Sequence, residues 1–223
     1  MASFILGNDP IATGEVVRPY PGRAHATLLL GVPHGEHSVT EGARAPLRLF
    51  HDDVELVLHG TPVQIMRTPE GWPLVRWVAG AGALHRVLRP RYYQGVPARL
   101  VAEDALKEVG EKFGALDLPS VLRVWVRHAE SAYRLLWRLA EREGRAIYVG
   151  EDGKVHAERP EWPPGPEVPG AKALGPGAYL APLDLSLRPG AEATLWLGGV
   201  RVPVRVSRIV YRLEKATMEV WRA

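Results

Sequence analysis

The chain has 223 residues, of which 46% are hydrophobic and 24% charged, which is ordinary for a soluble globular protein with one good core or two small ones. It has no cysteine, which excludes disulfides, thiolate metal sites and a cysteine nucleophile, and no apolar run approaches the roughly 20 residues of a membrane helix. A net charge of +3 with scattered arginines gives little support to nucleic-acid binding, and twenty prolines with more arginine than lysine favour a thermophilic source.

Residues 1–95 are predicted to form an N-terminal β-barrel module. Short apolar runs alternate there with turn signals such as Pro21-Gly22 and Pro69-Glu70-Gly71, a rhythm typical of an antiparallel barrel or sandwich. Residues 31–46 form a polar, glycine-containing loop that is long enough to be mobile or to contact a partner. The expected strands are residues 15–18, 26–30, 47–50, 54–58, 62–67, 74–78 and 84–88.

Residues 96–157 are predicted to form an α+β module. After Pro97, which suits a first helical position, the apolar residues follow a helical period, and Gly114 suits the end of that helix. Residues 121–127 then alternate as a strand. The first helix is expected to share one apolar face among Val101, Ala105, Leu106, Val109 and Phe113.

The stretch from Ser131 to Lys154 carries the strongest local pattern. Ser131 is expected to cap an amphipathic helix that ends at Gly144. A strand over Ala146–Val149, a tight turn at residues 151–153 and a returning strand over residues 155–157 should follow. The apolar face of the helix consists of Ala132, Leu135, Leu136, Leu139 and Ala140.

The last third of the chain is predicted to begin with a linker and to end with a second β-barrel module. Residues 158–177 hold six prolines and four glycines, which favours a linker or an extended surface loop over a core element. Residues 178–223 return to a β pattern with a hairpin turn at Gly198-Gly199. The strands expected there are 179–187, 193–197, 200–213 and 216–221.

Two patterns could suggest a metal or a dinucleotide, and in each case a simpler structural account is favoured. The residues at 34–37 (HGEH) and 51–53 (HDD) lack the helical spacing of a zinc site, so a solvated loop is the better interpretation. Gly80-Ala81-Gly82 lacks the third glycine of a dinucleotide fingerprint and is expected to form a tight turn. We therefore predict no metal-binding or cofactor-binding residue and no cofactor.

Three further patterns could suggest catalysis or recognition. Ser131 has no G-x-S-x-G context, so no serine nucleophile is predicted and the catalytic set is empty. The run Arg89 to Tyr93 could stack bases, but a link from barrel to helix with Tyr92 and Tyr93 half-buried is favoured. Trp162-Pro163-Pro164 is expected to belong to a stiff linker instead of a polyproline ligand. This lack of a site favours a structural or binding role over an enzyme.

The unit over residues 121–157 has a recurrent pattern of a strand, an amphipathic helix that ends at a glycine, and a hairpin with an Asp-Gly turn. The residues that form this pattern are Leu136, Leu139, Ala140, Gly144, Tyr148, Val149, Asp152, Gly153 and Lys154. In this pattern the unit resembles the phage tail and baseplate hub family, which comprises late control D proteins, the Mu-type baseplate hub and the hub part of the VgrG spike. The flanks agree in order, with residues 46–67 resembling the first barrel of the family, 98–109 its first helix, and 188–210 its second barrel.

The resemblance implies a fold of class α+β, in which two small antiparallel β-barrels flank a helix–strand–helix–hairpin unit. It also implies a homotrimeric ring in the virion that adapts the tail tube to the central spike or tip protein. Such a particle would be assembled in the host cytoplasm. We expect neither enzymatic activity, nor a membrane anchor, nor specific nucleic-acid binding. The alternatives are a tail-associated cell-wall hydrolase and an oligonucleotide-binding β-barrel protein.

Overall fold

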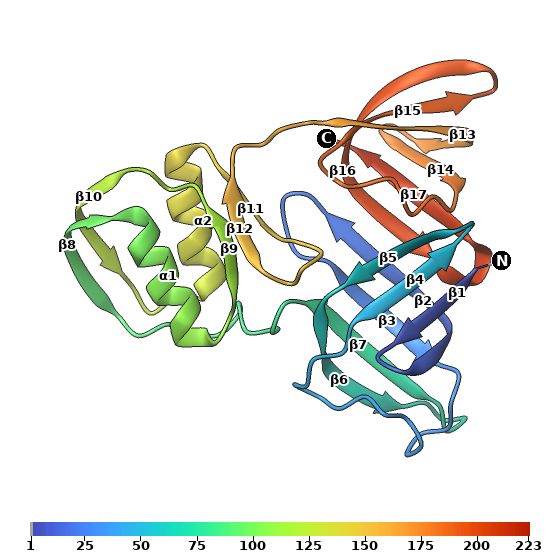
Figure 1. The fold of residues 1–223 in the computed structure, drawn as a ribbon, viewed down its shortest axis with the longest axis horizontal. Coiled ribbons are helices and arrows are strands. Elements are labelled where there is room, and N and C mark those ends of the chain that lie inside the picture. The colour runs from blue at the N-terminus through green and yellow to red at the C-terminus, as the bar shows by residue number, and fades with distance from the viewer. Residues whose placement is uncertain (1) are drawn as a thin grey trace.

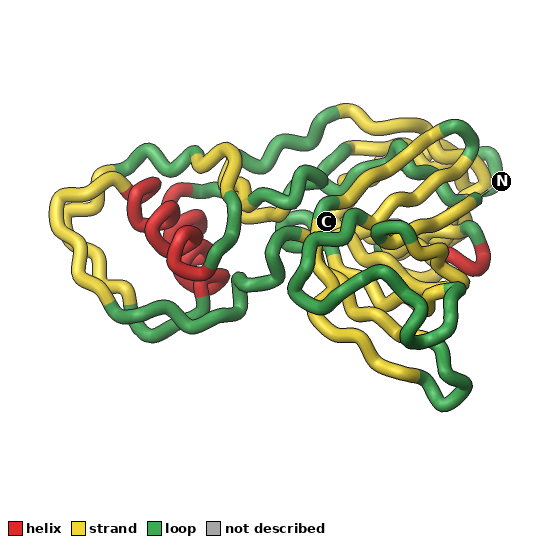
Figure 2. Tube along the Cα trace, turned by 60° about the horizontal axis from the view of Figure 1, so that its bottom comes forward, coloured by secondary structure: helices red, strands yellow, loops and turns green. Residues whose placement is uncertain are grey.

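A computed structural model describes residues 2–223, in which strands predominate and the two α-helices lie together in one smaller unit (Figure 2). The larger part is β-rich and is built from both ends of the chain, whereas residues 91–158 form the α+β unit that projects from it (Figure 1). This arrangement confirms an α+β class with β-rich flanks. Among residues 2–223 the structure has no helix with the length and apolar character that crossing a bilayer requires.

The N-terminal flank owes its form to a period of two along its strands. In β3, Ala26, Leu28 and Leu30 are buried, while His25 and Thr27 at the alternate positions are exposed. One face of the sheet is therefore apolar and covers a core. The strands are β1 (Ser3–Leu6), β2 (Asp9–Pro19), β3 (His25–Leu30), β4 (Leu47–His51), β5 (Val54–Leu58), β6 (Gly60–Arg67) and β7 (Pro73–Ala79).

The α+β unit packs its two helices together beside short strands. β12 pairs antiparallel with β11 and parallel with β9, and β8 pairs antiparallel with β10 as a separate ribbon. The elements are β8 (Arg91–Pro97), α1 (Ala98–Val109), β9 (Phe113–Leu116), β10 (Val121–Arg127), α2 (Ala132–Glu143), β11 (Ala146–Val149) and β12 (Val155–Glu158).

The predicted central helix is confirmed, whereas the first helix is shorter than predicted. The Ser131 side chain accepts a hydrogen bond from the Arg134 N–H, and Gly144 ends α2 in the left-handed conformation at φ 62°. Gly110, at φ 80°, likewise ends α1 in the left-handed conformation, so this helix does not extend to the predicted Gly114. Phe113, which was expected on the helix, begins β9.

The C-terminal flank contains β13 (Pro164–Gly175), β14 (Ala178–Pro182), β15 (Glu192–Leu197), β16 (Val200–Arg212), the 3-10 turn Leu213–Lys215 and β17 (Thr217–Arg222). β14 ends at Pro182, earlier than the predicted Leu187. The hairpin turn at Gly198-Gly199 is confirmed, with φ 56° and 89°.

The two flanks are joined through β16 in one mixed sheet of twelve strands. The first half of β16 pairs with β15, and its second half lies between β17 and β2, where Val210 is opposite Val17. β13 pairs in parallel with β15. Two separate antiparallel barrels are therefore not confirmed in the described residues, because this long strand continues past one flank and pairs with the other.

Two hydrophobic cores correspond to these parts. The first combines residues from both flanks, such as Leu28 and Trp77 with Leu195 and Tyr211, all fully buried. The second belongs to residues 83–157 and includes the predicted apolar face of α2. Full burial of one such leucine contributes about 1.5–3 kcal/mol, so each core holds its own part together.

Two predicted segments differ from the structure. Residues 164–175, expected to be a linker, form β13 and bury Val168 and Ala171 in the first core. Each half of β13 pairs with a neighbouring strand on one side only, so a proline whose missing N–H would face the other side costs no hydrogen bond of the sheet.

Residues 84–88, expected to be a strand, form turns that contact the start of α2, where the Leu84 carbonyl accepts a hydrogen bond from the Tyr133 N–H.

The loop over residues 31–46 is fixed to the N-terminal flank. The Asp9 carboxylate accepts the N–H groups of Ser38 and Val39 at 2.8 and 3.2 Å. The Trp77 indole N–H donates to the Ala45 carbonyl at 2.8 Å, and Val39 and Ala45 are buried. The loop therefore covers one end of the core instead of extending freely into solvent.

Candidate functional site at the junction of the hairpin with the sheet

The turn between β11 and β12 connects the α+β unit to the sheet. The His59 N–H donates to the Glu151 carbonyl, and the Val149 N–H to the Gly22 carbonyl, both at 2.9 Å. Gly153 has φ 70°, and a Cβ atom there would lie 2.6 Å from the His59 carbonyl oxygen. The glycine of the predicted turn is thus required both by the turn and by this close approach.

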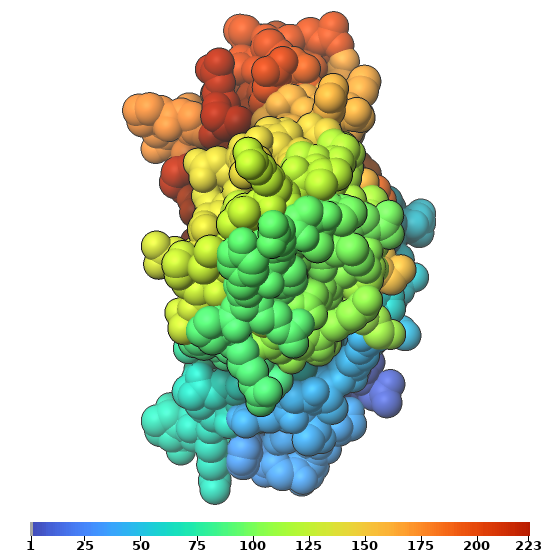
Figure 3. Space-filling view, turned by 90° about the vertical axis from the view of Figure 1, so that its left-hand side faces the viewer, coloured from blue at the N-terminus to red at the C-terminus, as the bar shows by residue number. Residues whose placement is uncertain are grey.

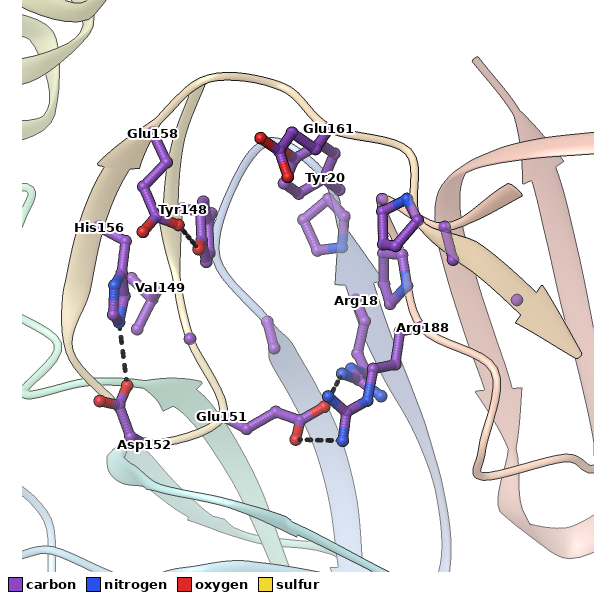
Figure 4. A pocket seen from close by; sticks show the side chains of 18 of the residues that line it. Arg18, Tyr20, Tyr148, Val149, Glu151, Asp152, His156, Glu158, Glu161 and Arg188 are labelled. Carbon is purple, nitrogen blue, oxygen red and sulfur yellow. Dashed lines mark hydrogen bonds and ion pairs between the residues drawn. The ribbon is translucent and has the colours of Figure 1, made fainter. Parts of the chain in front are cut away.

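A buried arginine lies beneath this turn. Arg18 of β2 is only 6% exposed, and its Nη2 donates to the Glu151 carboxylate at 2.6 Å. Its Nη1 donates to the hydroxyl of Tyr211 on β16 at 3.1 Å. Arg188 approaches the other oxygen of Glu151 at 3.5 Å (Figure 4). One guanidinium therefore links both flanks of the sheet to the hairpin of the α+β unit.

The pKa of Arg18 reflects this environment. Burial alone lowers it, but the interactions with Tyr211 and Glu151 outweigh burial, so the pKa of Arg18 is raised and the group stays charged. Burial raises the pKa of Tyr211, which keeps its hydroxyl protonated. A charged arginine with a neutral tyrosine and one carboxylate forms a stable buried network instead of a proton-transfer site.

An open cleft of about 1090 Å³ lies beside the network. Its aromatic wall consists of Tyr20 and Tyr148, with ring centroids 5.6 Å apart and planes at 53°, and His156, which stacks on Tyr148 at 5.2 Å. The Tyr148 hydroxyl donates to Glu158, and Glu161 lies near Tyr20 (Figure 4). The cleft is therefore aromatic and acidic at the end where β12 leads towards β13.

One carboxylate of the cleft, that of Asp152, does not have the environment of a general acid. Burial tends to raise the pKa of Asp152, but hydrogen bonds from Lys154 and His156 outweigh it, so the pKa is lowered. A hydrolase of the glycosidase type needs one carboxyl group with a raised pKa. The environment of Asp152 has the opposite effect.

The structure places the residues considered from the sequence at separate sites. The His34 and His37 rings lie 5.3 Å apart in the loop over residues 31–46, and His51 lies 3.3 Å from Asp52. Within residues 2–223 no group of three or more metal-ligating side chains is assembled. The tight turn at Gly80 to Gly82 is confirmed, because both glycines have φ near 78°.

The run of residues 89–93 differs from the prediction in one respect. Tyr93 is half-buried as expected, but Tyr92 is 62% exposed. Tyr92 lies opposite Val126 in the β8–β10 ribbon, where Val124 and Val126 are exposed too. This ribbon forms the end of the α+β unit that faces the viewer in Figure 3.

Sequence reasoning missed the network of Arg18, Glu151 and Tyr211. One signal was present, because Arg18 follows Val16 by two residues and a strand of period two places both on one face. A cation at an inward position requires a carboxylate partner. Nothing local indicates that this partner is Glu151, which is 133 residues away in the chain.

Comparison of the sequence with protein-family models and with curated proteins finds no match. The fold, in contrast, is similar to solved tail proteins. The 43 kDa tail protein of prophage MuSo2 from Shewanella oneidensis superposes with a TM-score of 0.71 at 8% identity, covering 100% of this chain and 98% of that one. A tail protein from Neisseria meningitidis gives 0.62 at 9% identity, covering 99% and 95%.

A third similar structure comes from a secretion machine. It is an E. coli protein described as a component of the type VI secretion system with structural similarity to bacteriophage T4 tail proteins. The TM-score is 0.67 at 12% identity, covering 99% of this chain and 76% of that chain. At such low identities these likenesses show a shared fold, in which all three parts of the chain take part.

Proposed function

We propose that the protein is a structural component of a phage tail or baseplate, or of a phage-like injection particle, and that it acts there as a hub. The observation that carries the proposal is the superposition of the whole chain, flanks and α+β unit together, on two tail proteins and a type VI secretion component.

The hub role implies a homotrimeric ring between the tail tube and the central spike or tip protein. Each chain carries two β-rich flanks, so three chains would place six such flanks around one axis and match a threefold spike to a sixfold tube. If the flanks are barrels in the assembly, neighbouring subunits would pair their open strand edges, such as those of β5 and β6. The particle, and thus the virion, would be the site of action.

The domain division proposed for this role is close to that of the two cores, although residues 83–88 contribute to the second core and β13 to the first. Residues 1–95 and 178–223 would form the ring together with β13, residues 96–157 would project from it, and residues 158–163, the first part of the predicted linker 158–177, would connect the projecting module to the second flank. The shared first core supports the joint action of the two flanks, because it contains side chains from both.

Light scattering of the purified protein over a concentration series tests the ring. Three chains of 24.6 kDa give 3 × 24.6 = 73.8 kDa, which is the expected mass. A stable dimer would contradict the threefold ring. Electron microscopy of negatively stained particles tests the hub role separately: intact tail tips on particles that lack this protein would refute it.

A further inference from the structure

We infer that the cleft beside the β11–β12 turn is a binding site for a basic side chain, lysine or arginine, carried by an extended segment of a partner protein. This goes beyond the proposed function, because it concerns what one cleft recognises and does not depend on the particle to which the protein belongs.

The charges of the cleft point to a cationic ligand. Its lining contains five carboxylates and three guanidiniums, the carboxylates being Asp117, Glu151, Asp152, Glu158 and Glu161 and the guanidiniums Arg18, Arg159 and Arg188. Three of the carboxylates already have cationic partners, through the pairs Asp117–Arg145, Glu151–Arg18 and Asp152–Lys154. Glu158 and Glu161 form no ion pair with any residue of the described chain, and they remain available to an incoming cation.

The two tyrosine rings of the cleft lie beside the carboxylates of Glu158 and Glu161. Glu161 lies beside Tyr20 (Figure 4), and burial raises the pKa of Tyr20, to which the negative charges of Glu158 and Glu161 add. Tyr148 donates its hydroxyl to Glu158 and meets Tyr20 at 53°. Two tilted aromatic faces with a carboxylate beside each form the environment that binds ammonium and guanidinium groups.

The geometry of the rings disfavours a saccharide. Sugars stack on a flat and open aromatic face, but His156 covers one face of Tyr148 in a 10° stack. A Cβ atom on Gly190 would lie 3.1–3.2 Å from the Tyr20 ring, so the backbone covers that ring on one side. Trp162 meets Tyr20 edge-on at 79°. The wall is therefore a set of inclined rings instead of a platform.

The size and remaining walls of the cleft indicate a chain segment instead of a small amine. At about 1090 Å³ the space exceeds what one lysine or arginine side chain fills, and it is slightly larger than ordinary ligand pockets of about 300–1,000 Å³. The prolines of the lining give apolar walls against which the methylene stem of a long basic side chain can pack. They are Pro19, Pro163, Pro164, Pro166 and Pro189.

The test uses the full chain with ¹³C-labelled tyrosine rings and NMR titration. The probe is the peptide acetyl-Gly-Ala-Arg-Ala-Gly-amide, and its control carries citrulline, which has the shape of arginine without its charge. We expect the arginine peptide to shift Tyr20 and Tyr148 ring signals and to bind at least about threefold more tightly than the control, the scale of one exposed cation–π contact.

Variants of the cleft make the test specific. Glu158→Gln and Glu161→Gln should each weaken binding by about threefold, which is within the range for an exposed ion pair. Arg159→Gln should leave binding unchanged or tighten it, because it removes a lining cation. Glu141→Gln, on the exposed side of α2 and outside the cleft, is the matched control and should have no effect.

Four results of the peptide titrations would overturn the inference. These are equal binding of the arginine and citrulline peptides, an absence of ring shifts with either peptide, loss of binding in Arg159→Gln, and unchanged binding in both glutamate variants. A chitin tetrasaccharide that shifts the same ring signals with no dependence on Glu158 or Glu161 would also overturn it, in favour of a sugar site.

Discussion

Replacing Glu151 by alanine should destabilise the protein strongly, because it leaves Arg18 buried without a carboxylate partner. Removing one partner of a fully buried ion pair costs about 3–5 kcal/mol. Here the Glu151 side chain is 31% exposed, so water already screens part of the interaction, and Arg18 keeps its contact with the Tyr211 hydroxyl at 3.1 Å. We therefore expect a loss of about 2–3 kcal/mol in the free energy of unfolding.

Urea unfolding followed by tryptophan fluorescence and far-ultraviolet circular dichroism measures this loss. Two probes are needed, because the two cores can separate into two transitions once the turn no longer binds the sheet. Glu141→Ala, on the exposed side of α2, should change stability by less than about 0.5 kcal/mol. In the double variant Arg18→Leu/Glu151→Ala the charge is gone, so much of the loss should be recovered.

A loss of less than about 0.5 kcal/mol for Glu151→Ala, the level of an ordinary surface substitution, would refute a stabilising contact between Glu151 and Arg18. A double variant whose loss equals the sum of the losses of Arg18→Leu and Glu151→Ala would refute it too. In that case the two residues would not be coupled, and Arg18 would be stabilised by Tyr211 or by water instead.

Three further predictions concern other contacts. Gly153→Ala should lower the free energy of unfolding by more than Gly144→Ala, for which we expect roughly 1 kcal/mol. Both glycines have φ near 65°, but only at Gly153 would the new Cβ lie 2.6 Å from a backbone atom, so equal losses in urea unfolding would contradict this. Arg127→Ala should cost about 2–3 kcal/mol in thermal unfolding, because its guanidinium is fully buried and bonds to Asp104, whose side chain is 32% exposed. A loss below about 1 kcal/mol would be inconsistent with that burial. Burial raises the pKa of Asp104, but the Tyr93 hydroxyl and the neighbouring arginines lower it by more, so the pKa in the folded protein is below that in the unfolded chain. The ionised Asp104 therefore stabilises the fold fully above the unfolded pKa of about 4, and this stabilisation is lost as the pH falls below that value. Asp104→Asn should weaken the dependence of the free energy of unfolding on pH in this acid range, which urea titrations at several pH values measure.

The sequence predicted those elements whose signals are local. α2 begins at Ser131 and ends at Gly144 as expected, because the cap, the apolar face and the terminal glycine all lie within the helix itself. The turn at residues 151–153 was equally accessible, since Asp-Gly between two short apolar runs fixes a hairpin.

Elements that depend on distant partners could not be found in this way. β13 looks like a linker from its prolines and becomes a strand only because β14 and β15 pair with its two halves. The Arg18–Glu151 pair likewise depends on the tertiary fold, and so does the cleft beside it. Only the inward register of Arg18 could have suggested that an acidic partner was needed.

The pairing of β2 with β16 has a consequence for the order of folding. The second core consists only of residues from 83 to 157, so the α+β unit can fold while the chain is still being synthesised. The first core, in contrast, needs strands that are nearly two hundred residues apart, with Val17 opposite Val210. It cannot close until β16 has left the ribosome. The unit in the middle of the chain is thus expected to fold first and to present its hairpin turn as a preformed surface on which the two ends of the chain meet.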